Sequence, residues 1–175
     1  RSILAGCKFS VGFARTAIYH IIEAVHNART RCMSRQFIDD IAQNCRGRNA
    51  KEVEDDCVKA VVMLADNLRK EGFKVSDKTV IVASTAVLRQ SIAKRLQRQG
   101  LDFKREKVTK DLGVDAAAGS RRCTVWQAKR IKKAARRGGK VRWLRKRSWK
   151  AKKLVAANLW PTMSYGISGY GAAPT

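Results

Sequence analysis

Apolar residues recur at helical spacing in three stretches of the chain, and each stretch predicts an amphipathic helix. We expect these helices over residues 13–26, 49–72 and 84–100. Asn49 and Glu52 have the spacing of a capping box at the start of the second helix. A glycine stands where each of the last two helices should end, which is its usual role there.

Two short segments, residues 32–37 and 41–44, flank the pair Asp39-Asp40. A two-residue Asp-Asp turn between them predicts a β-hairpin. A further buried strand is expected at residues 79–83, and extended pieces at 103–108 and 111–114.

The C-terminal part predicts basic helices. One is expected to start near Arg121 and to break at Gly138-Gly139, and the next to run from Lys140 to about Leu159, before Pro161. The order of elements favours an α+β fold, an antiparallel sheet backed by helices and followed by a basic helical region. The expected domains are residues 1–115 and 116–160, with a loosely ordered tail at 161–175.

Length and composition fit a globular domain: 175 residues, 45% hydrophobic and 30% charged. No stretch reaches the roughly 18 apolar residues of a membrane span, and no signal peptide is evident. The chain opens on Arg1 in the middle of a pattern, so we expect it to be a piece of something longer. Because neither a membrane span nor a signal peptide is evident, we expect no membrane partner and an intracellular location, nuclear or cytoplasmic.

Charge is large and unevenly placed. The formal net charge is +24, all 14 acidic residues lie at or before Asp115, and the 16 basic residues that follow have no acidic neighbour in sequence. An excess of this kind predicts a polyanionic partner. The alternative is a basic surface that only faces solvent.

Five cysteines lack the spacing of a structural zinc site, and their odd number does not suggest a disulfide framework. Reduced, mostly buried thiols in an intracellular protein are the expectation. The cysteines are Cys7, Cys32, Cys45, Cys57 and Cys123.

The pair Asp39-Asp40 is the strongest chemical signal in the sequence. Two adjacent carboxylates repel each other when both are ionised, and a divalent cation removes that cost. Mg²⁺ prefers one or two carboxylates together with substrate phosphates. The alternative is a plain polar turn, since Asp is common in turns.

The order of motifs resembles the reverse transcriptase family, particularly the enzymes of non-LTR retrotransposons and group II introns. Phe37-Ile38-Asp39-Asp40 looks like the aromatic-x-Asp-Asp motif of that family's palm. The other matching segments are Ile3-Leu4-Ala5-Gly6-Cys7 with the helix after it, Gly72 to Thr79 with Lys78, Lys110-Asp111-Leu112-Gly113-Val114 before the thumb, and Pro161 to Gly166 near its end.

The resemblance implies a partial polymerase palm and assigns roles to several residues. Asp39 would bind the catalytic Mg²⁺ or Mn²⁺ ions, with Asp40 in a supporting role, for two-metal nucleotidyl transfer. Lys78 would act near the triphosphate, and Gly6 and Phe37 would contact substrate. The alternatives are a solvated lysine for Lys78 and a plain turn glycine for Gly6.

The resemblance further implies a thumb that grips an RNA template and DNA primer, or a duplex, while the whole enzyme takes deoxynucleoside triphosphates. Basic residues interleaved with tryptophans suit phosphate contacts, although Trp126 and Trp160 favour core packing. A solvated helix face and, for Arg145-Lys146-Arg147, a nuclear-localisation role stay open. The candidate nucleic-acid-binding residues are Arg121, Arg122, Lys129, Arg130, Lys132, Lys133, Arg136, Arg137, Arg142, Arg145, Lys146, Arg147 and Lys150.

Two departures from the family pattern limit the expected activity. The family's other catalytic Asp precedes the glycine loop and is not in this chain, and residues 3–10 lack the family's Pro-Gln. The fragment alone should not polymerise. The competing functions are a non-catalytic nucleic-acid-binding protein, of ribosomal type or from a degenerate retroelement, and a basic structural protein that binds acidic partners.

Overall fold

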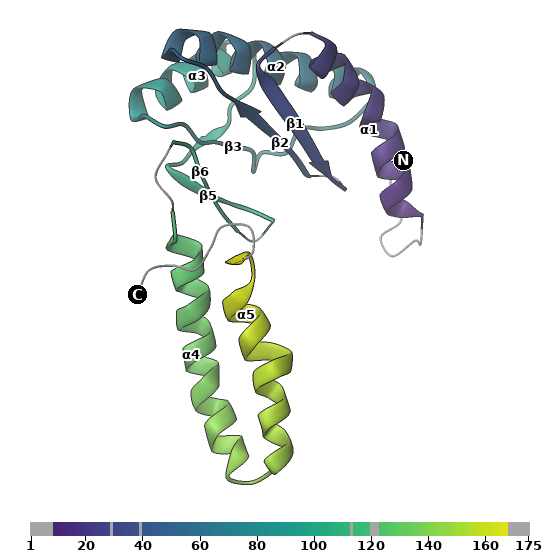
Figure 1. Cartoon of the computed structure of the whole chain (residues 1–175). Coiled ribbons are helices and arrows are strands. Elements are labelled where there is room, and N and C mark those ends of the chain that lie inside the picture. Colours follow the sequence, from purple (N-terminus) through teal and green to yellow (C-terminus); the bar gives the residue numbers. More distant parts are fainter. Residues whose placement is uncertain (1–8, 29, 39, 113, 120–122, 168–175) are drawn as a thin grey trace. The chain divides into compact units, whose positions relative to one another are not determined.

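The computed structural model describes residues 9–28, 30–38, 40–112, 114–119 and 123–167. Within them the chain is mixed α+β, as predicted, with five α-helices and short strands (Figure 1). The strands form three two-stranded sheets and not the one continuous antiparallel sheet that the pattern predicted. The chain divides into two compact units, Arg1–Ile81 with Thr85–Arg105 and Val82–Ser84 with Glu106–Thr175.

The first unit is built on two helices predicted from the apolar pattern. In α1 (Ser10–Asn27) the buried residues are Ala14, Ile18, Ile21 and Val25, which share one face of the helix. Ile18 and Ile21 pack against Leu68 of α2 (Ala50–Lys70), and Val25 packs against Ala60 of the same helix. These contacts form the core beneath the hairpin.

The predicted cap of α2 is present, and α3 begins with a cap of the same kind. Asn49 Oδ1 accepts a hydrogen bond of 2.8 Å from the backbone N–H of Glu52, and Thr85 Oγ1 accepts one of 3.2 Å from Leu88 at the start of α3 (Ala86–Arg98). Gly72 and Gly100 follow the two helices with φ of +80° and +73°, a conformation that favours glycine.

Charged side chains join α2 to α3. Glu54 accepts hydrogen bonds from Ser91 Oγ at 2.7 Å and from Arg95 at 3.2 Å. Asp55 pairs with the same Arg95 guanidinium. Hydrogen bonds to Asp55 and Glu54 raise the pKa of Arg95 above its usual value.

The predicted β-hairpin is present. Strands β1 (Cys32–Phe37) and β2 (Asp40–Cys45) pair antiparallel, with Cys32 opposite Cys45. These two cysteines are joined as a disulfide across the open end of the hairpin. The expectation of reduced thiols is wrong for this pair, because strand register brings together two cysteines that are 13 residues apart.

The strand predicted at residues 79–83 is shorter in the structure. Only β3 (Val80–Ile81) forms, and it pairs parallel with β4 (Lys104–Arg105). Each of the two strands follows a helix and its glycine, so the two helix-to-strand connections run side by side in the first unit.

In the second unit, the antiparallel strands β5 (Val108–Asp111) and β6 (Val114–Ala117) lead into α4 (Val125–Arg145). The carboxylate of Asp115 accepts hydrogen bonds from the backbone N–H groups of Trp126 at 2.7 Å and Gln127 at 2.9 Å. Asp115 is therefore a buried cap for the N-terminus of α4, supplied from the neighbouring strand.

Helix α4 folds back on a return segment, residues 149–164, which contains η1 (Trp149–Lys152), η2 (Val155–Leu159) and α5 (Trp160–Ser164). The predicted break at Gly138-Gly139 is wrong, because α4 runs through both glycines and Gly138 faces Leu159 of the return segment. Pro161 lies in the first turn of α5, a position that proline tolerates, and does not end the helical region there.

Candidate functional site

The tip of the hairpin differs from the predicted Asp-Asp turn by one residue. Phe37 pairs with Asp40, so residues 38–39 make the connection and Asp40 is the first residue of β2. Ile38 has φ of +59°, which is strained for a β-branched residue and costs about 1–3 kcal/mol. Asp39 lies outside the described residues.

Gln36 braces this strained tip. Its side-chain amide lies within hydrogen-bonding distance of two backbone carbonyl oxygens, that of Ala14 in α1 at 3.2 Å and that of Ile38 at 2.8 Å. The hairpin tip is thereby tied to α1 by a half-buried side chain. Sequence reasoning missed Gln36, because its partners lie on another element.

The two faces of the hairpin differ. Cys32 packs against α1 and α2, and Ile41 packs with Ile18, Ile21 and Leu68 of those helices. On the other face, Phe37 is 51% exposed and its cross-strand neighbour Asp40 is also exposed. The Asp40 carboxylate therefore stands on an open face, beside an aromatic ring.

Lys78 and Asp40 belong to segments that meet in one cluster of the core. Ile41, next to Asp40, and Val75, three residues before Lys78, both pack against the cluster of Ile18, Ile21 and Leu68. Lys78 itself is exposed in a turn, where its N–H donates to Ser76 Oγ at 3.2 Å. The fold thus brings the two segments near each other, and within the described ranges no hydrogen bond or ion pair joins the two side chains.

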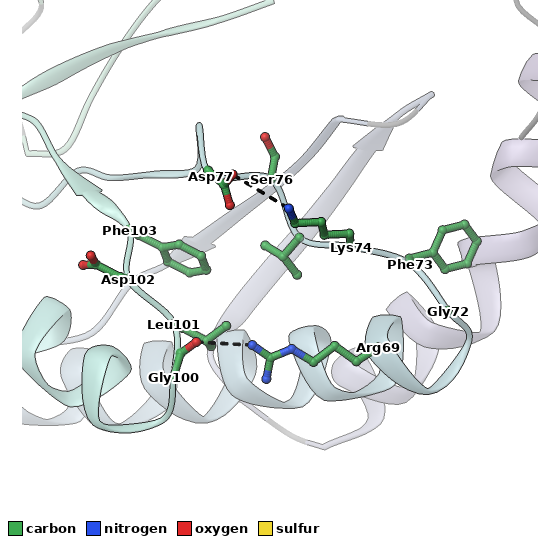
Figure 2. A pocket seen from close by; sticks show the side chains of 11 residues that line it. Arg69, Gly72, Phe73, Lys74, Ser76, Asp77, Gly100, Leu101, Asp102 and Phe103 are labelled. Carbon is green, nitrogen blue, oxygen red and sulfur yellow. Dashed lines mark hydrogen bonds and ion pairs between the residues drawn. The ribbon is translucent and has the colours of Figure 1, made fainter.

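A cavity of about 410 Å³ lies beside this turn, between residues 72–77 and 100–103 (Figure 2). An Arg69 guanidinium N–H donates to the Gly100 carbonyl oxygen at 3.3 Å and joins the two walls. Lys74 and Asp77 make an exposed ion pair of 3.9 Å at its edge. The ion pair lies in the loop that leads to Lys78.

The donor set at the hairpin fits a hard divalent cation only in part. Among the described residues, no three His, Cys, Asp or Glu side chains are grouped to hold a metal ion. Asp40 offers an exposed carboxylate, and the described part of the chain places no cation in an ion pair with it. Carboxylates are the ligands that Mg²⁺ prefers, so Asp40 suits this role once further ligands join it.

The second unit contains the basic candidates, and we call α4 together with the return segment the basic arm. From Ala116 onward the sequence has 16 basic and no acidic residues. Most of the candidates in the described part of the arm are exposed: Lys129, Lys132, Lys133, Arg136, Arg142, Arg145, Lys146, Arg147 and Lys150.

Two candidates join α4 to the return segment and to Tyr165, which directly follows it. Arg137 donates to Asn158 Oδ1 at 3.1 Å, and Arg130 donates to the Tyr165 carbonyl oxygen at 3.2 Å while lying over the Tyr165 ring. The two arginines are half-buried, on the side of α4 that also buries Gln127 and Ala134. The predicted site residues Gly6, Arg121 and Arg122 lie outside the described residues.

The tryptophans divide differently from the prediction. Trp126 is half-buried, with Lys129 Nζ 4.1 Å from its ring centre. Trp160, expected in the core, is 67% exposed, because α5 is short and buries none of its residues. Trp143 and Trp149 are also exposed, and each has a cation beside its ring.

Comparisons with protein-family models, with curated proteins and with solved structures found no match for this chain. Among the helices of the described ranges, none is both long and apolar enough to cross a membrane.

Proposed function

We propose that this chain is the second part of the palm and the thumb of an RNA-directed DNA polymerase. The observation that carries the proposal is the hairpin. Asp40 stands on its exposed face, close to the strained residue Ile38, while the other face packs on two helices. Backbone strain that the surrounding structure holds in place is typical of functional sites.

In this proposal the chain's own residues have separate roles. Asp39 and Asp40 supply carboxylate oxygens, and Gln36 keeps the tip in position through its bonds to Ala14 and Ile38. The exposed Lys78 neutralises charge on the triphosphate. Mg²⁺ or Mn²⁺, when bound, supplies activation of the primer 3′-hydroxyl and neutralisation of the pyrophosphate.

The basic arm holds the template and primer. Its exposed Lys and Arg side chains neutralise backbone phosphates, a contact that does not depend on base sequence. The full enzyme then takes deoxynucleoside triphosphates as substrates. An intracellular location follows from this function and belongs to the same proposal.

Primer extension tests the role of the carboxylates, in a longer chain that also carries the upstream Asp. Asp39→Ala should lower extension by about a hundredfold or more, the loss that corresponds to several kcal/mol of charge stabilisation. Affinity for the template–primer duplex should stay within about twofold, because the phosphates contact the basic arm. Asp66→Ala, at an exposed position of α2, is the matched control.

Extension at the wild-type rate by Asp39→Ala would refute the metal role. A second candidate, a nucleic-acid-binding protein without catalysis, is favoured by the basic arm alone, since its cations act without the hairpin. Duplex binding by a longer wild-type chain that never extends a primer would select this second candidate.

A further inference from the structure

The end of the basic arm where α4 turns back carries two exposed tryptophans. Trp143 is 53% exposed and Trp149 is 64% exposed. Burying a large apolar side chain stabilises a folded protein, so exposure of both rings does not serve the stability of the free protein. Exposed apolar groups that lie together mark interaction surfaces.

Each of these rings has a cation beside it. The guanidinium carbon of Arg147 lies 4.0 Å from the centre of the Trp143 ring, and Lys152 Nζ lies 4.9 Å from that of Trp149. Both distances fall within the range of cation–π interactions. Ring and charge are therefore presented together at the same place on the surface.

Cations and indole share one face of α4. Arg136, Lys140 and Trp143 follow each other at spacings of four and three residues, which places them on one stripe of the helix, and all three are exposed. Helices that lie on membranes separate an apolar face from a cationic one. Here the same stripe carries two cations and an indole, which favours a partner that offers both charged and aromatic groups.

Single-stranded nucleic acid has that alternation, because phosphates follow one another along the strand and unpaired bases offer free faces for stacking. A duplex offers its phosphates but keeps most of its base faces stacked inside. The absence of any acid from Ala116 onward adds charge complementarity to either form. Of these two forms, however, only the single strand offers free base faces on which the tryptophans can stack.

We propose that Trp143 and Trp149 form a stacking site for unpaired bases, so that the end of the basic arm binds a single strand of template or primer next to the duplex. This inference rests on the proposed function where it takes the strand to be template or primer. It extends that function by naming single-stranded nucleic acid as the form that is bound. The surrounding cations, with Arg147 and Lys152 nearest the rings, take the phosphates.

Titration of the full chain with oligothymidylate of about 16 nucleotides, followed by tryptophan fluorescence, tests the site. We expect the single strand to quench the emission and a duplex of equal length to quench it far less. Replacing both rings, as Trp143→Leu with Trp149→Leu, should weaken single-strand binding by about tenfold or more and abolish the quenching. Duplex affinity should change by less than about threefold, because phosphate contacts remain.

Trp160→Leu is the matched control, since Trp160 is 67% exposed and, among the described residues, has no cation over its ring. Circular dichroism verifies that the double variant folds, and a wild type that shows no quenching decides against the proposal without any variant. Absence of quenching by the single strand, or an equal loss of binding in Trp160→Leu, overturns the proposal.

Titration of the wild type and the same double variant with vesicles of anionic phospholipid distinguishes a lipid surface from single-stranded nucleic acid as the partner. A tryptophan response to vesicles in the wild type that is lost in the variant, while single-strand binding is unchanged, overturns the proposal in favour of a lipid surface. Quenching without metal-dependent primer extension in the longer chain keeps the stacking site and rejects the polymerase. Primer extension without quenching by the single strand keeps the polymerase and rejects the stacking site.

Discussion

At the scale of single residues, Asp115 is a buried acid that supports the second unit. It is 5% exposed and caps α4 with bonds to two backbone N–H groups. We expect Asp115→Ala to lower the free energy of unfolding by about 1–3 kcal/mol, since the buried N–H groups lose their acceptor. Urea unfolding followed by circular dichroism measures the change.

Asp111→Ala is the control for this substitution, because Asp111 lies on the neighbouring strand β5 and is exposed. It should change stability by less than about 0.5 kcal/mol. Equal effects of the two substitutions would show that the cap contributes nothing beyond a surface carboxylate.

Cys57 is the second residue whose environment sets its chemistry. Burial raises the pKa of its thiol from 9.0 to about 11. Because the thiolate is the reactive form, alkylation by iodoacetamide at pH 8 should be about a hundredfold slower in the folded protein than in urea. Peptide mass spectrometry measures the two rates, and equal rates would contradict the burial of this thiol.

The same shift has a defined sign for stability. The folded state keeps the Cys57 proton more tightly than the unfolded chain does, so this group's contribution to stability is complete below pH 9. That contribution is lost as the pH rises from 9 toward about 11.

Residue-scale features were the hardest to predict from sequence. Asp115 follows no rule of local capping, because its N–H partners lie 11 and 12 residues further along the chain. The pairing of Cys32 with Cys45 depends on strand register, and the position of Asp40 depends on a turn that includes a strained Ile38. Each is set by neighbours in space.

At the scale of elements, the continuity of α4 through two glycines gives a clear test. A Cβ added to Gly139 meets no atom within 4 Å, so Gly139→Ala should raise stability by about 0.5–1 kcal/mol through the higher helix propensity of alanine. Thermal or urea unfolding measures it. A loss of stability would mean that the helix breaks here, as the sequence alone suggested.

Gly72→Ala provides the opposite control. That glycine also has open space around it, yet its φ of +80° disfavours any side chain. We therefore expect Gly72→Ala to lower stability, so that the same substitution has opposite signs at the two glycines.

The elements with strong local signals were predicted well. Apolar spacing and caps gave α1, α2 and α3, with Gly72 and Gly100 behind the last two. Local signals failed at residues 138–139, where packing of α4 on the return segment outweighs the low helix propensity of glycine.

At the scale of the whole molecule, the charge of the basic arm should govern the salt dependence of duplex binding. Replacing Arg145, Lys146 and Arg147 by Gln removes up to three phosphate contacts, and the slope of log K against log salt should become shallower by up to about 0.9 for each contact. Binding measured between low and moderate salt gives this slope.

The matched control replaces Lys51, Lys59 and Lys70 of α2 by Gln, which changes the net charge equally at exposed positions of the first unit. Its slope should stay near that of the wild type. If both triple variants alter the slope by the same amount, net charge alone governs binding and the three basic-arm residues make no special contact.

For the whole molecule, the sequence predicted the distribution of charge but not the position of individual charged side chains. Charge asymmetry is visible in the order of residues, and it predicted that the second unit would be basic. The inward role of Arg130 and Arg137 was not visible, because it follows from the side of α4 that the return segment covers. The sequence therefore indicated the kind of partner better than the residues that meet it.

The lack of acidic residues from Ala116 onward also couples the folding of the second unit to the binding of a polyanion. Like charges crowded on one helical hairpin repel each other, and this repulsion is largest when the hairpin is folded and its phosphate partners are absent. A bound polyanion screens the repulsion and favours the folded form by mass action. The melting temperature of the second unit should therefore rise with the fraction of the unit that has bound the polyanion.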